Sequence, residues 1–398
     1  MPMTNVVKTI WISAGDVSGD LIAGDLVRAI RERIPSARLV GMGGREMSAA
    51  GVDLVADANA LAVGGLLELI PSLFRIIGTW RRAVQALRAC DPDLVILIDA
   101  GGFHLPFARV ARRQTRAQVL YYVAPQVWAW RGGRLRKLAA RTDRIAVVLP
   151  FEPEFYEKRG AKAEFVGHPI LDRAVADPIG NETQALARSA LDLDPAAPLL
   201  GLFPGSRRNE LARNLPVQLA ALRRLRADLP SLLGIIAVAP SLDRGAIHEI
   251  VAAAGARDSV IVRDANDQIH DAIDVALAKP GTVTLELLLR ETPMVVMAIV
   301  HGASAAIARR ALQIPWVAMP NLIAERAIVP ERLQTDATAD RIAADLAALF
   351  PQVQEGSARR SASAERQVEA LRAARSRLGE PGASRRVAAI AADLLEEN

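Results

Sequence analysis

The sequence predicts two α/β domains, each built on a doubly wound and mostly parallel β-sheet. Three observations lead to this fold class. The chain has 398 residues, which is long for one domain and suits two hydrophobic cores. Short apolar segments alternate with helical patterns along most of its length. A polar stretch rich in proline separates two such series, and a helical tail follows the second.

The first series predicts an N-terminal domain over residues 1–174. It opens with an apolar segment at 9–13, a turn of Gly, Asp and Ser, and a helix that ends near Arg33. The segment 94–98 contains only large aliphatic residues, which is typical of a strand buried on both faces of a parallel sheet. The other predicted strands are 37–41, 119–123, 144–148 and 163–166.

The second series predicts a C-terminal domain over residues 198–345. Residues 175–197, with their prolines and a glycine, are expected to form a linker that includes a short helix. The predicted strands of this domain are 199–203, 233–238, 260–262, 275–278 and 294–297. Residues 346–398 are expected to form C-terminal helices whose arginines lie on solvated faces.

Composition limits the function classes. Hydrophobic residues make up 51% and charged residues 23%, as in globular proteins. The net charge of +5 could favour anionic lipid, phosphate or nucleic acid, but aromatics are only 4% and are not interleaved with basic residues, so we predict no nucleic-acid partner. The single cysteine, Cys90, excludes an internal disulfide and fits a reducing cytoplasm. No apolar run reaches about 18 residues, and no signal-peptide pattern is present, so we expect no spanning helix.

Two motifs of the first series point to a site at the carboxyl end of its sheet. Asp99 directly follows the buried segment 94–98, where a carboxylate can act as a general base toward an attacking hydroxyl. A simple turn-capping role is the alternative. The turn Gly15–Asp20 follows the first strand, and its amides, with Asp16 and Ser18, could contact an anion or sugar hydroxyls. Ser18 and Asp20 could equally be helix caps.

Two turns of the second series are suited to phosphate. Arg can bind phosphate oxygens with both arms of its guanidinium, and glycine-rich turns before helices present free amides. The first turn, PGSRRNE at 204–210, offers Gly205, Ser206 and Arg207. The second, KPGTVTLE at 279–286, offers Gly281 and Thr282. Glu286 could bind ribose hydroxyls, or it could be a solvated residue that complements the helix dipole. Asn321 is expected to bring an amide to the same edge.

Metal binding is not predicted. Asp91 and Asp93 have the spacing that some transferases use for a metal, but they precede their strand and are interpreted as a turn. No cluster of His, Cys and Asp has metal-ligand spacing. We therefore predict neither a metal nor a cofactor.

Residues 66–88 form an amphipathic pattern with an unusually wide apolar face. Pro71 and Gly78 predict a break or two pieces. Such a face usually packs into a core, but a basic helix that carries a tryptophan can also lie on an anionic membrane. The candidate membrane or acyl-chain contacts are Leu66, Leu69, Ile70, Leu73, Phe74 and Ile77.

Taken together, these segments resemble the lipid-A-disaccharide synthase family. The most distinctive match is YVAPQVWAWR at 122–131. Others are GDVSGD at 15–20, LPFE at 149–152, VGHP at 166–169, the PGSR turn with Glu210, Gly281–Thr282 with Glu286, and PNL at 320–322. The matches run in the family's order from about residue 11 to 335 and so cover nearly the whole chain.

The resemblance implies a GT-B architecture of two facing Rossmann-like domains. It implies inverting, metal-independent transfer of 2,3-diacylglucosamine from its UDP derivative to 2,3-diacylglucosamine 1-phosphate, giving a β-1,6 disaccharide and UDP. By this resemblance Asp99 and Arg207 are the catalytic residues. The partners would be a UDP-sugar donor, an acylated glucosamine phosphate acceptor and the cytoplasmic face of the inner membrane, where the protein would be peripheral. The sequence assigns no oligomeric state.

The chain departs from the family pattern near the predicted acceptor site. Gly101-Gly102-Phe103-His104 stands where the family usually has Pro-Asp-Phe-Asn, so a carboxylate and an amide are missing, and His104 could replace one of them. Asp16 stands where a Glu is usual. Two alternatives therefore stay open: a GT-B transferase or UDP-sugar epimerase that acts on a non-acylated sugar, and a non-catalytic relative that binds lipid or nucleotide.

Overall fold

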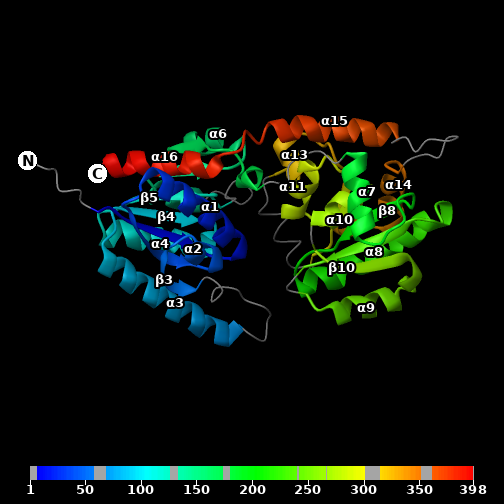
Figure 1. Ribbon diagram of the computed structural model, residues 1–398, viewed down its shortest axis with the longest axis horizontal. Helices are drawn as coiled ribbons and strands as arrows, with labels where there is room; N and C mark the ends of the chain where they lie inside the picture. Colours follow the sequence, from blue (N-terminus) through cyan, green and yellow to red (C-terminus); the bar gives the residue numbers. More distant parts are fainter. Residues whose placement is uncertain are drawn as a thin grey trace, which may run out of the picture. The chain divides into compact units, whose positions relative to one another are not determined.

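The computed structural model describes residues 7–57, 69–125, 133–173, 180–239, 242–265, 267–300, 314–350 and 361–397. The chain divides into two compact units. The N-terminal unit consists of residues 1–173 together with 378–398, and the C-terminal unit consists of residues 174–377. Each is described separately below, and Figure 1 labels many of their helices and some of their strands.

The N-terminal unit contains, in its described part, a seven-stranded sheet with the order β3-β2-β1-β4-β5-β6-β7. Every neighbouring pair in this sheet is parallel. The strands are β1 (Thr9–Ala14), β2 (Arg38–Gly43), β3 (Asp53–Asp57), β4 (Leu94–Ile98), β5 (Gln118–Tyr122), β6 (Arg144–Val147) and β7 (Ala163–Phe165). The helices are α1 (Val17–Arg33), α2 (Arg45–Ala49), α3 (Leu69–Cys90), α4 (Gly101–Gln114), α5 (Gly133–Ala139), α6 (Glu152–Glu157), η4 (Pro169–Asp172) and α16 (Ala383–Glu396).

The C-terminal unit contains, among its described residues, a six-stranded parallel sheet with the order β10-β9-β8-β11-β12-β13. The strands are β8 (Leu199–Phe203), β9 (Leu233–Val238), β10 (Val260–Asp264), β11 (Val275–Ala278), β12 (Met294–Ala298) and β13 (Glu331–Leu333). The helices are α7 (Asn181–Ala190), α8 (Arg208–Asp228), α9 (Arg244–Ala253), η5 (Arg257–Ser259), α10 (Asp267–Ala272), α11 (Thr282–Leu289), α13 (Met319–Ala324), η6 (Gln334–Asp336), α14 (Ala339–Ala347) and α15 (Ala362–Ser376).

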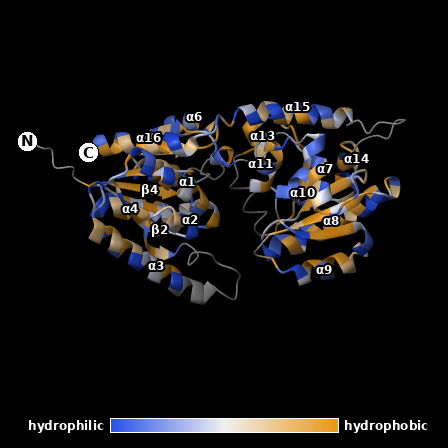
Figure 2. Cartoon of the chain, viewed as in Figure 1, coloured by the Kyte–Doolittle hydropathy of each residue, from blue (hydrophilic) through white to orange (hydrophobic). Residues whose placement is uncertain are grey.

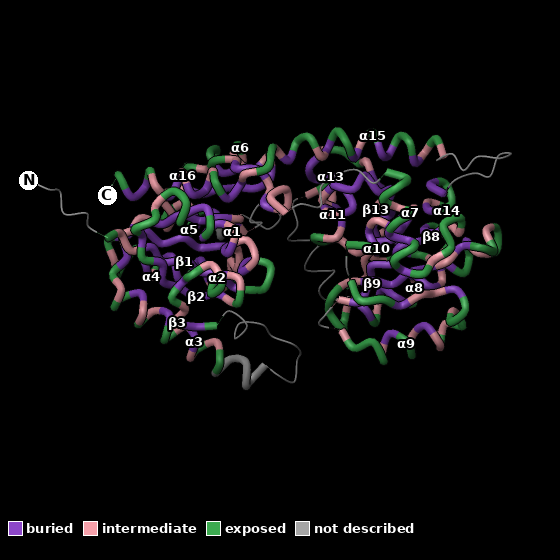
Figure 3. The backbone as a smooth tube through the Cα atoms, viewed as in Figure 1, coloured by how far each residue is buried: buried purple, intermediate pink, exposed green. Residues whose placement is uncertain are grey.

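The central strands form the cores of both units. All five residues of β4 and all five of β8 are buried, as their continuous apolar sequences predict. Hydrophobic residues are concentrated on the strands in Figure 2, and the same strands are buried in Figure 3. The prediction of two doubly wound, Rossmann-like domains with parallel sheets is confirmed.

Both sheets reverse their strand order at one place, and this reversal locates the candidate sites. From β1 the chain adds β2 and β3 on one side, whereas β4 pairs with the other side of β1 and the sheet then grows away from it. In the C-terminal unit the same reversal separates β8 from β11. Ligands of such sheets bind outside the carboxyl ends of the strands at the reversal. The predicted motifs follow β1, β4, β8 and β11, which are these four strands.

The C-terminal helices are divided between the two units. Helix α15 packs on α11 and α13 of the C-terminal unit, whereas α16 packs on α1 and η4 of the N-terminal unit (Figure 1). The Asp172 carboxylate explains the second attachment, because it accepts hydrogen bonds from the backbone amides of Gly382, Ala383 and Ser384 at the start of α16. Residues 346–398, expected as one segment, therefore contribute to both units.

Candidate functional site

Asp99 lies in a backbone turn of unusual conformation at the end of β4. Asp99 and the following Ala100 have φ angles of 49° and 45°, in the left-handed region that costs non-glycine residues roughly 1–2 kcal/mol each. The surroundings compensate for this strain. The amide of Asp99 donates to the carbonyl oxygen of Tyr122 at 3.1 Å, and its own carbonyl oxygen accepts from the Tyr121 hydroxyl at 2.5 Å. Strain held in this way is typical of functional turns.

The side chain of His104 forms a hydrogen bond with the backbone of the same turn. It was predicted on the acceptor side, but its side chain is fully buried in α4. Its Nδ1 lies 2.9 Å from the carbonyl oxygen of Asp99, and its Nε2 lies 2.8 Å from the hydroxyl of Ser13. A carbonyl oxygen can only accept, so Nδ1 carries the proton and the Ser13 hydroxyl donates to Nε2. Burial lowers the pKa of His104 to about 4, so its ring is neutral at pH 7.

The carboxyl group of Asp99 has a raised pKa. Burial, followed by the nearby negative charge of Asp16, raises its pKa to about 6. A base with a pKa close to the working pH can accept a proton from a reacting hydroxyl while remaining largely ionised. A pKa of about 6 is compatible with the general-base role that the sequence predicts for Asp99.

The turn after β1 lies directly against the turn after β4. A Cβ atom at Gly15 would lie 2.1 Å from the Cβ of Ala100, so only glycine fits at this contact. Asp16 is the N-cap of α1, because its Oδ1 accepts from the amide of Gly19 at 2.7 Å. Asp16 and Ser18 are both exposed beside the turn. Asp20 is buried and instead accepts from backbone amides at the start of α2, including that of Gly44 at 2.6 Å.

Gly101 and Gly102, which differ from the usual Pro and Asp of the family, have different surroundings. A Cβ atom at Gly101 would lie 2.6 Å from the Cβ of Pro125, which explains the absence of an ordinary side chain there. Gly102 has no atom within 4 Å of the corresponding position. A carboxylate at position 102 would therefore extend into open space near the start of α4.

In the C-terminal unit, Glu210 organises the turn that follows β8. Its Oε2 accepts from the amide of Ser206 at 3.2 Å, and its Oε1 lies 3.0 Å from Nζ of Lys279. Gly205 has a φ of 117°, and a Cβ atom there would lie 2.5 Å from Oε2 of Glu210. Lys279 follows β11, so this one carboxylate links the two turns at the reversal of the sheet.

Arg207 extends from this turn into solvent. Its side chain is 82% exposed and lies 3.6 Å from Glu210, a distance at which an exposed ion pair contributes little. Its guanidinium is thus available for an anion. Lys279 and Glu210 belong to the two predicted phosphate motifs, although the sequence alone assigns neither of them a role. Their opposite charges, in two motifs that follow strands of one sheet, are the sequence feature that indicates this ion pair.

Gly281 and Thr282 form the start of α11. Gly281 has a φ of 153°, and both residues are exposed, so the first amides of the helix face solvent. The hydroxyl of Thr284 donates to the carbonyl oxygen of Gly281 at 2.7 Å and fixes this turn. Exposed amides at a helix start attract anions.

Glu286 and Asn321 are held by protein groups. Burial raises the pKa of Glu286, but the hydrogen bond and charge of His270, 3.3 Å away, outweigh it and lower the pKa. Asn321 is fully buried; its Nδ2 donates to Val329 and Glu331, and its Oδ1 accepts from the amides of Ile328 and Val329. These four bonds use the amide's capacity, so Asn321 shapes the loop before β13 and has no group left for a ligand.

The predicted membrane or acyl-chain contacts fall largely outside the described side chains. Leu66 lies outside the described residues, and Leu69, Ile70, Leu73 and Phe74 lie in α3 with side chains that are not described. Ile77 is 38% exposed. No helix in the described ranges is long and apolar enough to cross a bilayer. Nor do these ranges contain a cluster of three or more His, Cys, Asp or Glu residues suited to a metal.

Comparison with protein families gives one match over nearly the whole chain. The family described as lipid-A-disaccharide synthetase matches residues 10–384. The lipid-A-disaccharide synthase of Geobacter metallireducens is 38% identical over 388 residues, which cover 98% of this chain and 97% of that protein. The lipid-A-disaccharide synthase of Anaeromyxobacter dehalogenans strain 2CP-C is 39% identical over 379 residues, which cover 95% of each chain.

Solved structures show the same fold at low sequence identity. MnaA of S. aureus, solved with UDP, is 12% identical with a TM-score of 0.64, and the match covers 96% of this chain and 95% of that one. MurG of Acinetobacter baumannii is 14% identical with a TM-score of 0.56, and the match covers 98% of this chain and 100% of that one. Anabaena HepE, solved with UDP and glucose, is 13% identical with a TM-score of 0.56, and the match covers 98% of this chain and 100% of that one. These similarities support the GT-B fold.

Proposed function

This chain belongs to the lipid-A-disaccharide synthetase family, and we propose that it transfers 2,3-diacylglucosamine from its UDP derivative to 2,3-diacylglucosamine 1-phosphate. The products are a β-1,6-linked disaccharide and UDP. The observation that carries the proposal is the family match over residues 10–384, together with about two-fifths identity to lipid-A-disaccharide synthases over nearly their full length. The chain is accordingly a glycosyltransferase.

Asp99 is proposed as the base of this reaction. Its carboxylate would take the proton from the 6-hydroxyl of the acceptor while that oxygen attacks the anomeric carbon of the donor. The bond from this carbon to the UDP oxygen breaks, and its electron pair leaves with UDP. The raised pKa of about 6 supports the assignment, because a stronger base accepts the proton more readily. His104, Tyr121 and Ser13 are positioning residues, since they hold the Asp99 turn.

The turns after β8 and β11 are proposed to bind the diphosphate of the donor. Arg207 would place its guanidinium on the phosphate oxygens, and the amides of Gly205, Gly281 and Thr282 would donate to them. Ser206, whose amide already donates to Glu210, would shape this turn. Fixed positive charge of this kind stabilises the charge that develops on the leaving group. Glu286 is proposed to bind ribose hydroxyls, and Asn321 to hold the loop behind the site.

Asp16 and Ser18 are proposed to contact the acceptor. Both are exposed beside the Asp99 turn. Asp16 also has an electrostatic role, because its charge helps to raise the pKa of Asp99. The proposed acceptor carries acyl chains, so we further propose that the protein works as a peripheral protein at the cytoplasmic face of the inner membrane.

The reaction can be tested directly with purified protein. UDP release would be measured with UDP-2,3-diacylglucosamine and 2,3-diacylglucosamine 1-phosphate in detergent micelles, and the disaccharide identified by mass spectrometry. We expect UDP and disaccharide in equal amounts. The same assay with UDP-N-acetylglucosamine tests transfer or epimerisation of a non-acylated sugar. Turnover of that donor alone would contradict the proposal. UDP binding without turnover of any acylated donor would identify a non-catalytic relative.

A further inference from the structure

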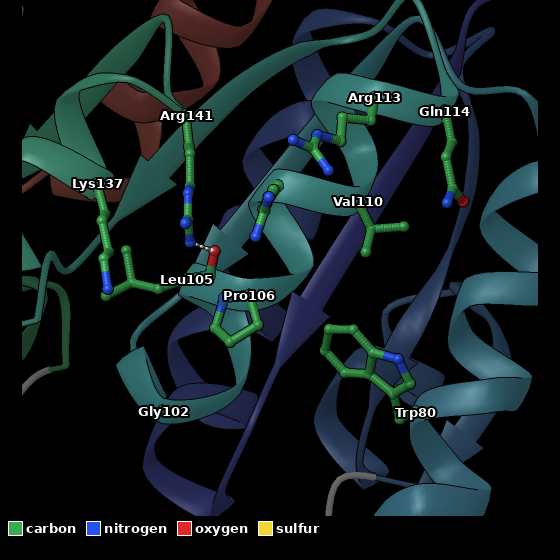
Figure 4. Close-up of a pocket in the computed structure, with 10 residues that line it drawn as sticks. Trp80, Gly102, Leu105, Pro106, Val110, Arg113, Gln114, Lys137 and Arg141 are labelled. Carbon is green, nitrogen blue, oxygen red and sulfur yellow. Dashed lines mark hydrogen bonds between the residues drawn. The ribbon is translucent and has the colours of Figure 1, made fainter.

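A pocket of ≈ 580 Å³ opens on the N-terminal unit beside α4. We call it the α4 pocket. Four cations line it: Arg109 and Arg113 from α4, Lys137 from α5, and Arg141 from the turn that follows α5. Its apolar lining includes Trp80 from α3 and Val110 from α4 (Figure 4). The four cations and Val110 were assigned no role above, whereas Trp80 belongs to the amphipathic segment 66–88.

Helical spacing brings the cations together. Arg109 and Arg113 are four residues apart on α4 and so lie on one face of this helix. Lys137 and Arg141 have the same separation at the end of α5. Figure 4 shows Arg113, Lys137 and Arg141 extending toward the pocket from separate elements. The guanidinium of Arg141 is fixed there, because its Nη1 donates to the carbonyl oxygen of Leu105 at 2.7 Å.

Among the described residues, no acidic side chain neutralises the positive charge of the α4 pocket. Within the described part of the chain, no carboxylate forms an ion pair with any of its four cations, and no acidic residue lines it. Arg112 on the same helix offers a contrast, since it pairs with Asp143 at 2.8 Å. Partial burial and then the like charges of Arg109 and Arg113 lower the pKa of Arg141. An anion in the pocket would relieve this repulsion.

The apolar side of the α4 pocket is rigid. The Trp80 ring packs edge-on against Phe103 and Phe107, with ring centroids 5.2 Å and 5.8 Å apart. It therefore stays beside Val110 without having to be ordered by a ligand. The pocket joins a cationic side to an apolar side, which suits an amphiphile whose anionic group is attached to hydrocarbon.

We propose that the α4 pocket binds the headgroup phosphate of an anionic phospholipid and so docks the N-terminal unit on a bilayer. The four cations contact the phosphate, and the first carbons of the lipid lie against Trp80 and Val110. The apolar side of the pocket favours a lipid over free phosphate, because free phosphate has no hydrocarbon to place against it. A nucleic acid is disfavoured because the described lining contains a single aromatic ring, which is already packed edge-on. The inference deepens the proposed function, since it supplies the membrane site that an acylated substrate requires.

The test is flotation of the full-length protein with vesicles in the absence of substrate. Vesicles of phosphatidylcholine alone are compared with vesicles that contain about 30% phosphatidylglycerol, whose negative surface attracts basic residues. The wild type should float with the anionic vesicles and much less with the neutral ones. Each basic residue near such a surface contributes a factor of about five to binding, so Arg109→Gln with Arg113→Gln should weaken the partition coefficient about 25-fold.

A matched control separates the pocket from net charge. Arg116→Gln with Arg136→Gln also removes two exposed arginines that have no ion pair among the described residues, but neither lines the α4 pocket. The Arg116 and Arg136 substitutions should weaken binding less than about threefold, because neither side chain would contact the lipid phosphate and the attraction of exposed charges is weakened by salt. A second pocket variant, Val110→Glu, introduces a carboxylate beside the cations and should weaken binding, whereas Val110→Gln should do so much less.

Each remaining outcome contradicts the proposal. An equal loss in the pocket and control pairs would show attraction to net charge alone. Calorimetric binding of inorganic phosphate, or of a single-stranded oligonucleotide, without flotation would identify a different ligand. If the folded wild type fails to float with either kind of vesicle, the docking role is rejected. Because flotation needs no turnover, a failure here is distinct from a failure of UDP release in detergent micelles, which would reject the proposed reaction instead.

Discussion

The turn after β4 and the turn after β8 each lie where the strand order of their own sheet reverses, yet different interactions hold them. In the N-terminal unit the Asp99 carbonyl is held by two neutral donors, His104 and Tyr121. In the C-terminal unit the Glu210 carboxylate holds its turn and pairs with Lys279, and Arg207 stays exposed. The first arrangement raises a carboxyl pKa by burial, and the second presents positive charge to solvent. The same fold would therefore support the proposed base in one unit and the proposed anion site in the other.

Loss of the Asp99 carboxylate should have the largest effect. Asp99→Asn keeps the shape of the side chain and tolerates the left-handed backbone, but it cannot accept a proton. We expect kcat to fall about 10²–10⁴-fold, the range typical of general-base catalysis. UDP release under saturating substrate measures this. Asp91→Asn is the matched control, because Asp91 also has a positive φ, of 35°, and lies before the same strand. Equal losses in both variants would refute a catalytic role for Asp99.

Loss of the Arg207 guanidinium should have the next largest effect. Arg207→Ala should lower kcat/KM about 10²–10³-fold, as expected for removal of one group that stabilises transition-state charge. Arg207→Lys should recover only part of the rate, because an ammonium cannot bind two phosphate oxygens side by side. Arg208→Ala removes the neighbouring exposed arginine and should leave the rate within about twofold of wild type. A loss from Arg208→Ala as large as that from Arg207→Ala would contradict the assignment.

The pH profile tests whether burial tunes the base. A carboxyl whose pKa is raised to about 6 is protonated, and inactive as a base, below that pH. The value of kcat/KM should therefore fall as pH drops below about 6 and level off above it. Asp16→Asn keeps a side chain able to cap α1 but removes the like charge. It should move the acidic limb to lower pH. A limb that stays in place would show that Asp16 does not act on Asp99.

The smallest expected effect concerns His104 as a positioning residue. Loss of one buried hydrogen bond to the Asp99 carbonyl costs about 1–3 kcal/mol, so His104→Ala should lower kcat roughly 10-fold or more while leaving the KM of the UDP-sugar unchanged. His104→Asn, which restores an amide as in the family pattern, should recover part of the rate. A fall in thermal stability without any change in kcat or its pH profile would show that His104 is only structural.

Much of the fold could be predicted because its signals are local. Apolar segments such as 94–98, followed by glycine-containing turns and helices, indicate parallel strands and also place Asp99 and Arg207 at strand ends. The division of the C-terminal helices was not predictable in this way. It depends on Asp172, which caps α16 from more than two hundred positions earlier in the chain.

The surroundings of individual polar residues could not be predicted for the same reason. His104 is buried because Ser13 on β1 and the Asp99 backbone both face it, and nothing in its own helix encodes these partners. The hydrogen-bonding capacity of the Asn321 side chain is used by Glu331 and by the loop residues just before Glu331, such as Val329. In both cases a polar residue near a motif resembled a ligand contact until the three-dimensional partners were known.

The most direct test of the division of labour between the units is the affinity for UDP of Asp99→Asn and Arg207→Ala, measured by titration calorimetry on folded protein. If the anion site belongs to the C-terminal unit, Asp99→Asn should bind UDP within about twofold of wild type. Arg207→Ala should bind it about tenfold or more weakly, the loss expected for one charge-assisted contact. Equal weakening in both variants, or weakening in Asp99→Asn alone, would contradict the account.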